Sequence, residues 1–368
     1  MLFVCLSHFS GTYLFQTGAE GIGASLAVVG MIASPTFVAV SGLVAGFLAV
    51  TNPRMFPHLR RKLIDRGVFL LLVGHVILAF TDLPAGFGFA HAYRIGFITD
   101  AIAVAVMLGP WLVNKMSRKQ RLLLALTIFG LSWCAILGWH PTGPIPTLVK
   151  HYIVGIPDPD SQGLPFPVYP VIPWFCVYLA ATIVGERVGA YYLRNDKTSA
   201  NKFLASVGST ALVSALLVRT IGFLVRRQAP AFAQIHSQLM LFLSGYQKFP
   251  PGPVYLTFFG GAGMLLVCGV LELERRGSMA FAVEQMRQIG QASLFVYVAQ
   301  FYLFAVGLRE LHLPYTPFWP LLFVVSLAVL ARAAALWNAR DGNRFLTVGL
   351  TYLLERKAKR RQETLRPA

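Results

Sequence analysis

The histidines are the residues of this chain best suited to chemistry, because an imidazole exchanges protons near neutral pH. The chain has eight of them, and most fall on one expected face of the protein. Two are candidate catalytic bases: His8, in the first apolar segment, and His91, in a later loop. A hydrogen-bonded or solvated side chain is the plainer interpretation of any single histidine. None has the spacing of a metal-binding motif such as His-Glu-x-x-His, so the sequence predicts no metal.

Two charged residues mark the entrance of a later apolar segment. Arg94 and Asp100 are six residues apart on the expected outer side. Charged groups near a bilayer interior are costly, and they usually face a cavity or a partner. The pair fits contact with a polar substrate, and it also fits a structural ion pair, which is the plainer interpretation.

The composition indicates what kind of protein must position these residues. The 368-residue chain is 56% hydrophobic and 13% charged, whereas soluble domains carry about 25% charged residues. The net charge of +17 taken alone would suggest a nucleic-acid partner. However, the charges lie in short clusters between long apolar runs. The pattern therefore predicts an all-α, polytopic membrane bundle with no nucleic-acid partner.

Apolar runs divide the chain into about ten predicted spanning helices. The run 1–15 is short, and we expect it to be the second half of a helix that begins upstream of Met1. The more polar stretch 231–246 is expected to be re-entrant or interfacial. One membrane domain over 1–340 and a basic tail over 341–368, with an interfacial helix, describe the organisation. The other predicted spans are 24–50, 67–83, 97–114, 121–139, 169–189, 203–225, 252–273, 290–309 and 317–338.

The basic clusters predict the orientation. If the predicted spans alternate, the clusters all fall on one side, and the positive-inside bias makes that side cytoplasmic. We therefore expect a multi-pass protein of a bacterial inner membrane, with a cytoplasmic C-terminus and basic side chains against anionic lipids. The clusters lie within 54–66, 115–121, 187–202, 275–287 and 356–361.

Two proline-rich stretches enter spans from the expected outer side. They are 140–173 and 248–253. Because proline fixes φ and lacks an N–H donor, these stretches are stiff. They would frame a cavity on that face, although prolines at helix starts are a sufficient structural explanation.

Six short motifs lie in order at 1–9, 34–42, 93–100, 171–174, 246–251 and 291–297. Together they resemble the bacterial branch of the heparan-α-glucosaminide N-acetyltransferase catalytic-domain family, a group within the transmembrane acyltransferases. The resemblance runs over nearly the whole chain, with a Pro-Trp element and a Lys-Phe-Pro-Pro element as its most specific parts. Two departures stand out: the Asp-x-x-Arg-Gly start of the family is absent, and Gln300 stands where many relatives have a histidine.

The resemblance implies transfer of an acyl group, acetyl from acetyl-CoA, to a sugar hydroxyl or amine of a glycan or glycolipid. His8 stands at the matching position of the first helix, and it would deprotonate the acceptor or carry the acyl group. His91 is the second candidate. Arg94 would hold an anionic group, and basic residues near 60–66 would attract the CoA phosphates. The candidates for binding donor or acceptor are Arg94, Asp100, Trp174, Tyr297, Arg60 and Arg61.

Other classes of protein fit the same sequence. Broken helices and charges within spans also suit a transporter or a lipid- or glycan-handling protein without catalysis. The sequence has no detectable internal repeat, which counts against a transporter. A structural partner in an envelope-assembly complex is the third reading. The oligomeric state stays open, with a homodimer as one option.

Overall fold

The computed structural model describes residues 1–15, 17–81, 95–156, 168–244, 248–308, 311 and 313–349. Within these ranges the chain forms helices and two isolated bridges but no strand. The prediction of an all-α fold is therefore confirmed for the described part of the chain.

Seven helices in the described ranges are long and apolar enough to cross a membrane. This agrees with a multi-pass membrane protein. It does not establish the predicted total of ten, because the remaining predicted spans are short or broken. The seven are α2 with α3 (Glu20–Gly30 and Ala33–Thr51), α7 (Ile98–Lys115), α8 (Arg118–Gly138), α10 (Val171–Leu193), α11 (Lys197–Gln228), α14 (Pro253–Arg275) and α17 (Trp319–Ala339).

The shorter helices explain the difference from ten. The α15 helix bends by 84° into α16 and the π-helical segment η5, and this bent pair meets the length and hydropathy criteria for a span only when its two parts are joined. The predicted span 67–83 is instead part of a helix that starts earlier, at Phe56, and contains a π-helical turn. The bounds are α1 (Leu2–Phe9), η1 (Ser10–Leu14), α4 (Phe56–Phe69), η2 (Leu70–Gly74), α5 (His75–Ala79), α15 (Ala280–Gln291), α16 (Ser293–Phe301) and η5 (Tyr302–Leu308).

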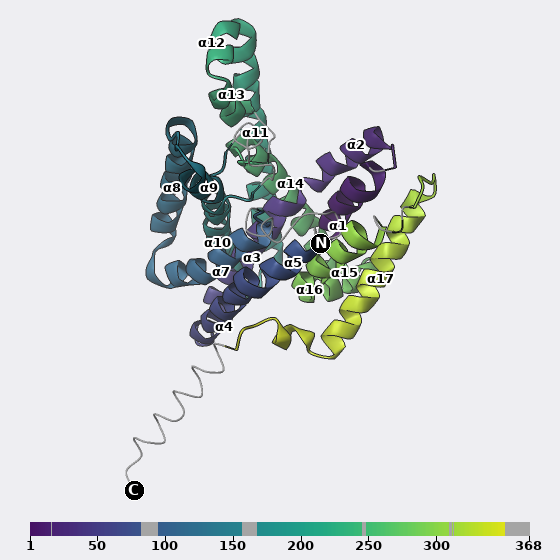
Figure 1. The fold of residues 1–368 in the computed structure, drawn as a ribbon. Helices are drawn as coiled ribbons and strands as arrows, with labels where there is room; N and C mark the ends of the chain where they lie inside the picture. The colour runs from purple at the N-terminus through teal and green to yellow at the C-terminus, as the bar shows by residue number, and fades with distance from the viewer. Residues whose placement is uncertain are drawn as a thin grey trace.

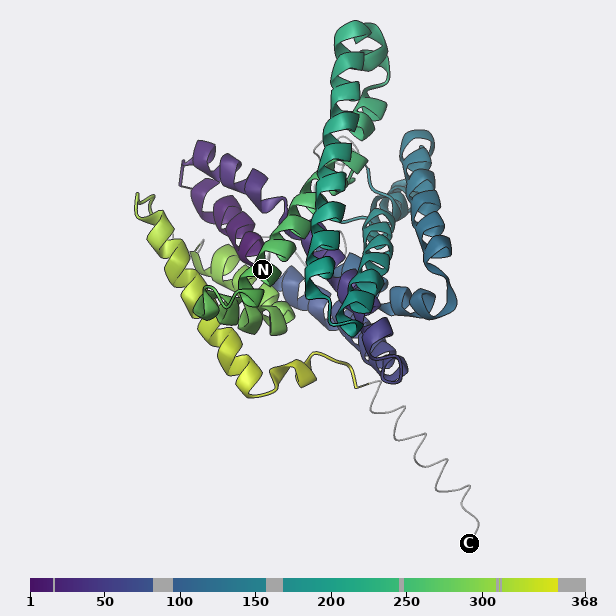
Figure 2. The same cartoon turned by 180° about the vertical axis from the view of Figure 1, so that it is seen from behind.

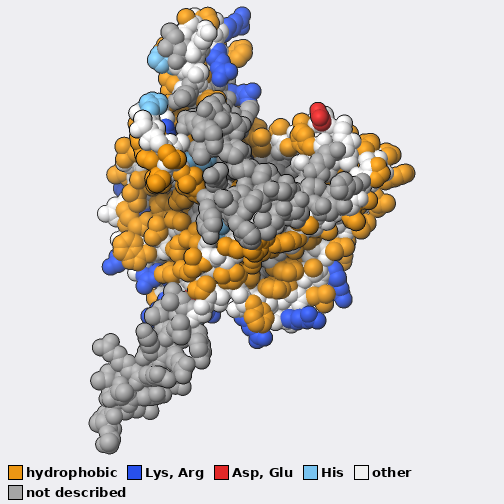
Figure 3. Space-filling model, viewed as in Figure 1, with side chains coloured by type: hydrophobic (Ala, Val, Ile, Leu, Met, Phe, Trp, Pro, Cys, Tyr) orange, Lys and Arg blue, Asp and Glu red, His pale blue; other side chains and the backbone are white. Residues whose placement is uncertain are grey.

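Successive long helices run up and down through the bundle (Figures 1 and 2). The α11 helix projects furthest and carries α12 (Pro230–Ile235) and α13 (Ser237–Ser244) at its tip. The stretch 231–246, expected to be re-entrant or interfacial, thus contributes two short helices there. Lys and Arg side chains gather along the lower edge and again near the tip of α11, with hydrophobic side chains between them (Figure 3).

Local signals fix the starts of several helices. The α8 helix begins with a capping box, in which the Gln120 amide donates to Ser117 Oγ and the Ser117 amide donates to Gln120 Oε1. The α11 helix begins after Asp196, whose carboxylate accepts the Ser199 amide at 2.9 Å. Hydrogen bonds from Ser199 lower the pKa of the Asp196 carboxyl. The 3-10 turn η6 (Gly342–Phe345) is the only helix in the described part of the basic tail.

Glycine allows α3 and α10 to approach each other closely. A Cβ atom at Gly42 would clash with the Tyr178 carbonyl oxygen, and one at Gly46 would clash with the Thr182 carbonyl oxygen. Gly185 of α10 has the same relation to the Leu43 carbonyl oxygen. Small residues four apart are a common device for close helix packing in membranes. The contact holds α3 in the centre of the bundle.

A buried ion pair joins α8 to α10. The Arg121 guanidinium is 1% exposed, and it donates to Glu186 Oε1 and to Thr182 Oγ1, the latter at 2.7 Å. Arg118, which is more exposed, donates to Glu186 Oε2 at 2.6 Å. Arg121, which the sequence placed among loop charges, is therefore a buried structural residue.

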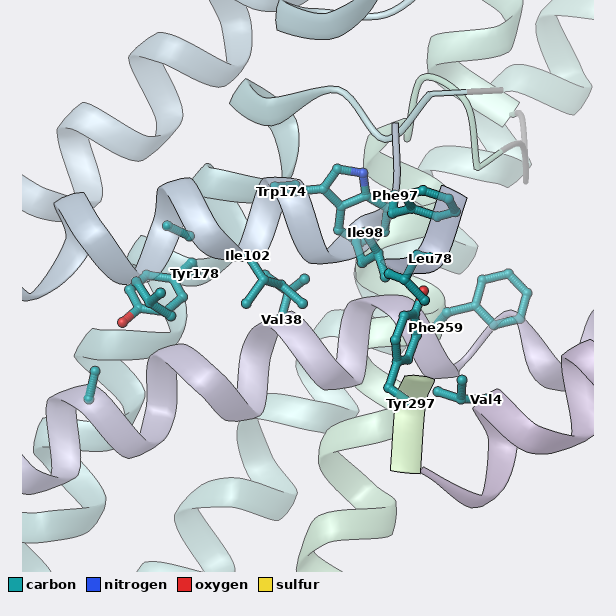
Figure 4. Packing of buried hydrophobic residues seen from close by; sticks show 14 of the residues in the cluster. Val4, Val38, Leu78, Phe97, Ile98, Ile102, Trp174, Tyr178, Phe259 and Tyr297 are labelled. Atoms are coloured by element: carbon teal, nitrogen blue, oxygen red, sulfur yellow. The ribbon is translucent and has the colours of Figure 1, made fainter. Parts of the chain in front are cut away.

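The largest buried cluster lies where α3, α7, α10 and α16 meet. It contains Val38 of α3, Ile98 of α7, Trp174 of α10 and Tyr297 of α16 (Figure 4). Trp174 is fully buried, and Tyr297 is 4% exposed. The cluster fixes the positions of the helices that carry the candidate site.

Candidate functional site

His8 lies near the end of α1 and is bound by a residue from the other end of the chain. The side-chain amide of Gln300 lies 2.6–2.9 Å from His8 Nδ1, and Gln300 is fully buried. Phe301 covers the imidazole, with 4.3 Å between ring centroids. The ring of Tyr297 lies edge-on at 6.2 Å. The imidazole is therefore held by α16 on two sides.

The Gln300 amide also indicates how His8 is oriented. Gln300 Nε2 donates to the Tyr297 carbonyl oxygen at 3.0 Å, which fixes the nitrogen end of this amide. The second N–H of this amide can donate to His8 Nδ1 at 2.6 Å, or Gln300 Oε1 can accept from Nδ1–H at 2.9 Å, depending on the tautomer. The other ring nitrogen, Nε2, has no hydrogen-bond partner among the described residues. In the tautomer that carries its proton on Nδ1, this nitrogen keeps its lone pair and can act as a base.

A small polar cavity adjoins His8. Its volume of about 20 Å³ has room for about one water-sized group. The polar members of its wall are hydroxyl, imidazole and ammonium groups, and none of its described lining residues is acidic. The wall consists of Val4, Ser7, His8, Gly30, Ala33, Ser34, Phe37, Ile98, Tyr169, Lys248 and Tyr297.

Lys248 and Tyr169 form the side of this cavity that comes from the proline-rich stretches. The Lys248 ammonium lies 4.8 Å from the centroid of the Tyr169 ring and 5.4 Å from that of Phe249. The Tyr169 hydroxyl lies 3.4 Å from Ser34 Oγ, which is a long hydrogen bond. One residue of each proline-rich stretch therefore lines the cavity next to His8.

A second, larger cavity lies on the side of α3 that faces α4. Its volume is about 510 Å³, which is within the range of small-molecule sites, roughly 300–1,000 Å³. Its wall is mostly apolar and includes Val40 and Ile102. Arg66 is the charged residue among its described lining residues.

The two cavities meet at α3. Ala33 and Phe37 line both of them. The Phe37 ring is stacked on Tyr297, with 6.3 Å between centroids and 20° between planes. The side chains of Ala33 and Phe37 therefore border both the polar cavity at His8 and the apolar cavity with Arg66.

Asp100 takes part in a separate pair. Its Oδ2 lies 2.9 Å from His75 Nδ1 and accepts the Phe97 amide at 2.8 Å at the start of α7. His75 contacts Phe97, and Phe97 contacts Phe301, which covers His8. Burial, and then the charge of Asp100, raise the pKa of the nearby Tyr152 phenol. Asp100 is a helix cap paired with a histidine, and it does not line either cavity.

The other predicted site residues fall in different places. Tyr297 lines the His8 cavity, whereas Trp174 is fully buried behind it, with its ring 5.7 Å from that of Tyr169. Arg60 and Arg61 lie on α4, but Arg66 is the residue of that helix that lines the large cavity. The predictions for His91 and Arg94 lie outside the described residues.

Sequence reasoning missed the roles of Gln300 and Lys248 in this site. In the sequence, Gln300 is only a departure from the family pattern, and Lys248 is only part of the Lys-Phe-Pro-Pro element. Ser34 opens the motif 34–42, and Tyr169 lies two residues before the motif 171–174. Membership in these motifs is therefore the sequence signal that could have pointed to the site. Among the described residues, no group of three or more His, Cys, Asp or Glu side chains could hold a metal ion.

Comparison with known protein families, with curated proteins and with solved structures gives no match for this chain.

Proposed function

We propose that this chain is an integral membrane acyltransferase. It moves an acyl group, acetyl from acetyl-CoA in the simplest case, to a hydroxyl or amine of a glycan or glycolipid. The observation that carries the proposal is the meeting of a polar, histidine-lined cavity and an apolar cavity at Ala33 and Phe37. The order of the family-like motifs supports the same class.

His8 acts as the general base. Its free ring nitrogen takes the proton of the acceptor hydroxyl or amine as that group attacks the thioester carbonyl carbon. The new C–O or C–N bond forms, the C–S bond breaks, and the proton passes from His8 to the departing thiolate. Gln300 keeps the imidazole in the required tautomer through Nδ1.

The larger cavity suits the acyl donor. A volume of about 510 Å³ accommodates an extended, largely apolar arm. The Arg66 guanidinium can bind a phosphate oxygen of the donor. The thioester carbonyl then enters the small cavity next to Ala33 and Phe37. The reacting hydroxyl or amine of the acceptor reaches His8 from the side with Lys248 and Tyr169, while the rest of the acceptor stays outside this cavity.

The proposal is tested by acyl transfer with the purified full chain in proteoliposomes, with acetyl-CoA and a panel of glycan and glycolipid acceptors. Wild type should release free CoA only when an acceptor is present. His8→Ala should lower kcat by about 10²–10⁴, the usual contribution of a general base. His236→Ala is the control, because His236 lies at the tip of α11 against Phe232.

Two results would count against the proposal. Equal kcat for His8→Ala and wild type would remove His8 from the mechanism. Acceptor flux across the bilayer without release of free CoA would favour a transporter instead.

A further inference from the structure

The Lys248 ammonium is a charged group next to the candidate site to which the proposed function gives no chemical role. It lies beside two aromatic rings and lines the His8 cavity. It forms no ion pair with a described carboxylate. Aromatic faces hold a cation in an apolar setting but leave its N–H donors available. The ammonium is therefore free to bind a negative group inside the cavity.

The size of the cavity limits what that negative group can be. A volume of about 20 Å³ holds about one water-sized group, which is much less than a phosphate or a sugar needs. The Ser34 and Tyr169 hydroxyls are only weakly joined, at 3.4 Å, so each can turn its hydrogen towards a guest. Together with Lys248 they offer several donors around a space for one oxygen atom.

We propose that Lys248, with the Tyr169 and Ser34 hydroxyls, forms a binding site for a single anionic oxygen next to His8. This inference rests on the proposed function. The anionic oxygen is the thioester carbonyl oxygen, which becomes negative when the acceptor attacks the carbonyl carbon. Lys248 is then a catalytic residue that stabilises the tetrahedral intermediate. The negative charge is lost again when the C=O bond reforms and the thiolate leaves.

The binding site can be tested without any acyl transfer. Chloride is a monatomic anion that fits the cavity, whereas gluconate is too large. The melting temperature of the purified full chain is measured as chloride replaces gluconate at constant ionic strength. Wild type should become more stable with chloride, as linkage requires of a ligand that binds the folded state. Lys248→Gln should lose the chloride effect, and Lys248→Arg should keep part of it.

Arg227→Gln is the matched control, because this exposed cation lies near the end of α11 and lines neither cavity. It should keep the full chloride effect. The melting temperature of each variant in gluconate reports whether it is folded. If Lys248→Gln does not fold, Lys248→Met and Tyr169→Phe provide the same comparison.

Kinetics then test the catalytic role. Lys248→Gln should lower kcat by about 10²–10³, as loss of one donor to an oxyanion does, with the KM of the acceptor unchanged. A rise in KM at constant kcat would overturn the role, because Lys248 would then bind the ground state. A chloride effect of wild-type size in Lys248→Gln would overturn the site itself. A chloride effect that depends on Lys248, in a protein without acyl transfer, would uphold the anion site and reject the proposed function.

Discussion

At the scale of single residues, the candidate site depends on a contact between the two ends of the chain. His8 and Gln300 are separated by 292 positions, yet their side chains are in hydrogen-bond contact. The chemistry of His8 was predictable from its residue type and its place in an apolar helix. Its partner was not, because a contact of this kind depends on how α1 and α16 pack.

Replacing Gln300 should affect activity only through His8. Gln300→Ala removes the group that orients the imidazole, so we expect kcat to fall about tenfold, the equivalent of one hydrogen bond of about 1.4 kcal/mol. Because the two side chains act as a unit, His8→Ala with Gln300→Ala should be no slower than His8→Ala alone. The measurement is kcat for the two single variants and the double variant. Additive losses would contradict a positioning role for Gln300.

At the scale of secondary-structure elements, the site is bordered by irregular helix geometry. The described part contains three π-helical segments, η1, η2 and η5. The first begins two residues after His8, the second ends just before His75, and the third begins just after Phe301. Such segments are frequent at functional sites, because they shift the face that a helix presents. All three adjoin one series of ring contacts, which runs from His75 through Phe97 and Phe301 to His8.

The sequence predicted these elements only in part. Hydropathy located α7, α8, α10, α14 and α17 to within a few residues, because one long and mostly apolar stretch makes up most of each helix. It did not show that the helix containing the predicted span 67–83 begins earlier, at Phe56, because α4 starts in a basic stretch that is not apolar. Periodicity also does not reveal a π-helical turn. The close helix packing at Gly42 and Gly46 was not predicted from the sequence either, and it is seen only in the structure.

The glycine contact between α3 and α10 should be intolerant of larger side chains. At Gly46 the Thr182 carbonyl oxygen occupies the space of a side chain, so Gly46→Val forces the helices apart. We expect a loss of about 1–3 kcal/mol in the free energy of unfolding, which is typical of overpacking. Gly130→Val is the control, because nothing lies within 4 Å of a Cβ there. Unfolding in mild detergent gives the comparison, and equal losses for both variants would contradict the close approach.

The buried ion pair between α8 and α10 gives a second prediction at this scale. Glu186→Gln leaves the Arg121 guanidinium, which is 1% exposed, without a carboxylate, so we expect a loss of about 3–5 kcal/mol. Glu272→Gln breaks exposed pairs with Arg275 and Arg276 and should cost less than about 1 kcal/mol. Thermal or denaturant unfolding of the two variants measures the difference. A small effect at Glu186 would mean that water reaches Arg121.

At the scale of the whole molecule, the positions of the two cavities bear on how the bundle is oriented in the membrane. The polar cavity is lined in part by Tyr169 and Lys248 of the proline-rich stretches, and the apolar cavity lies against α4, which also carries Arg60 and Arg61. Basic side chains gather at the lower edge of the molecule, where α4 lies (Figures 1 and 3). If that edge is cytoplasmic, as the positive-inside bias predicts, then the donor cavity faces the compartment that contains CoA.

Site-directed labelling tests this direction. In a variant in which the four cysteines are replaced, Arg61→Cys should react with a membrane-impermeant thiol reagent only in inverted vesicles. His140 follows the C-terminal end of α8, whose N-terminal end carries a predicted cytoplasmic basic cluster. His140→Cys should therefore react only in intact spheroplasts. Both positions are exposed, so reagent access depends on the side and not on burial. The reverse pattern would place the Arg66 cavity on the outer face, and an acyl donor from the cytoplasm would then have no route to His8 through it.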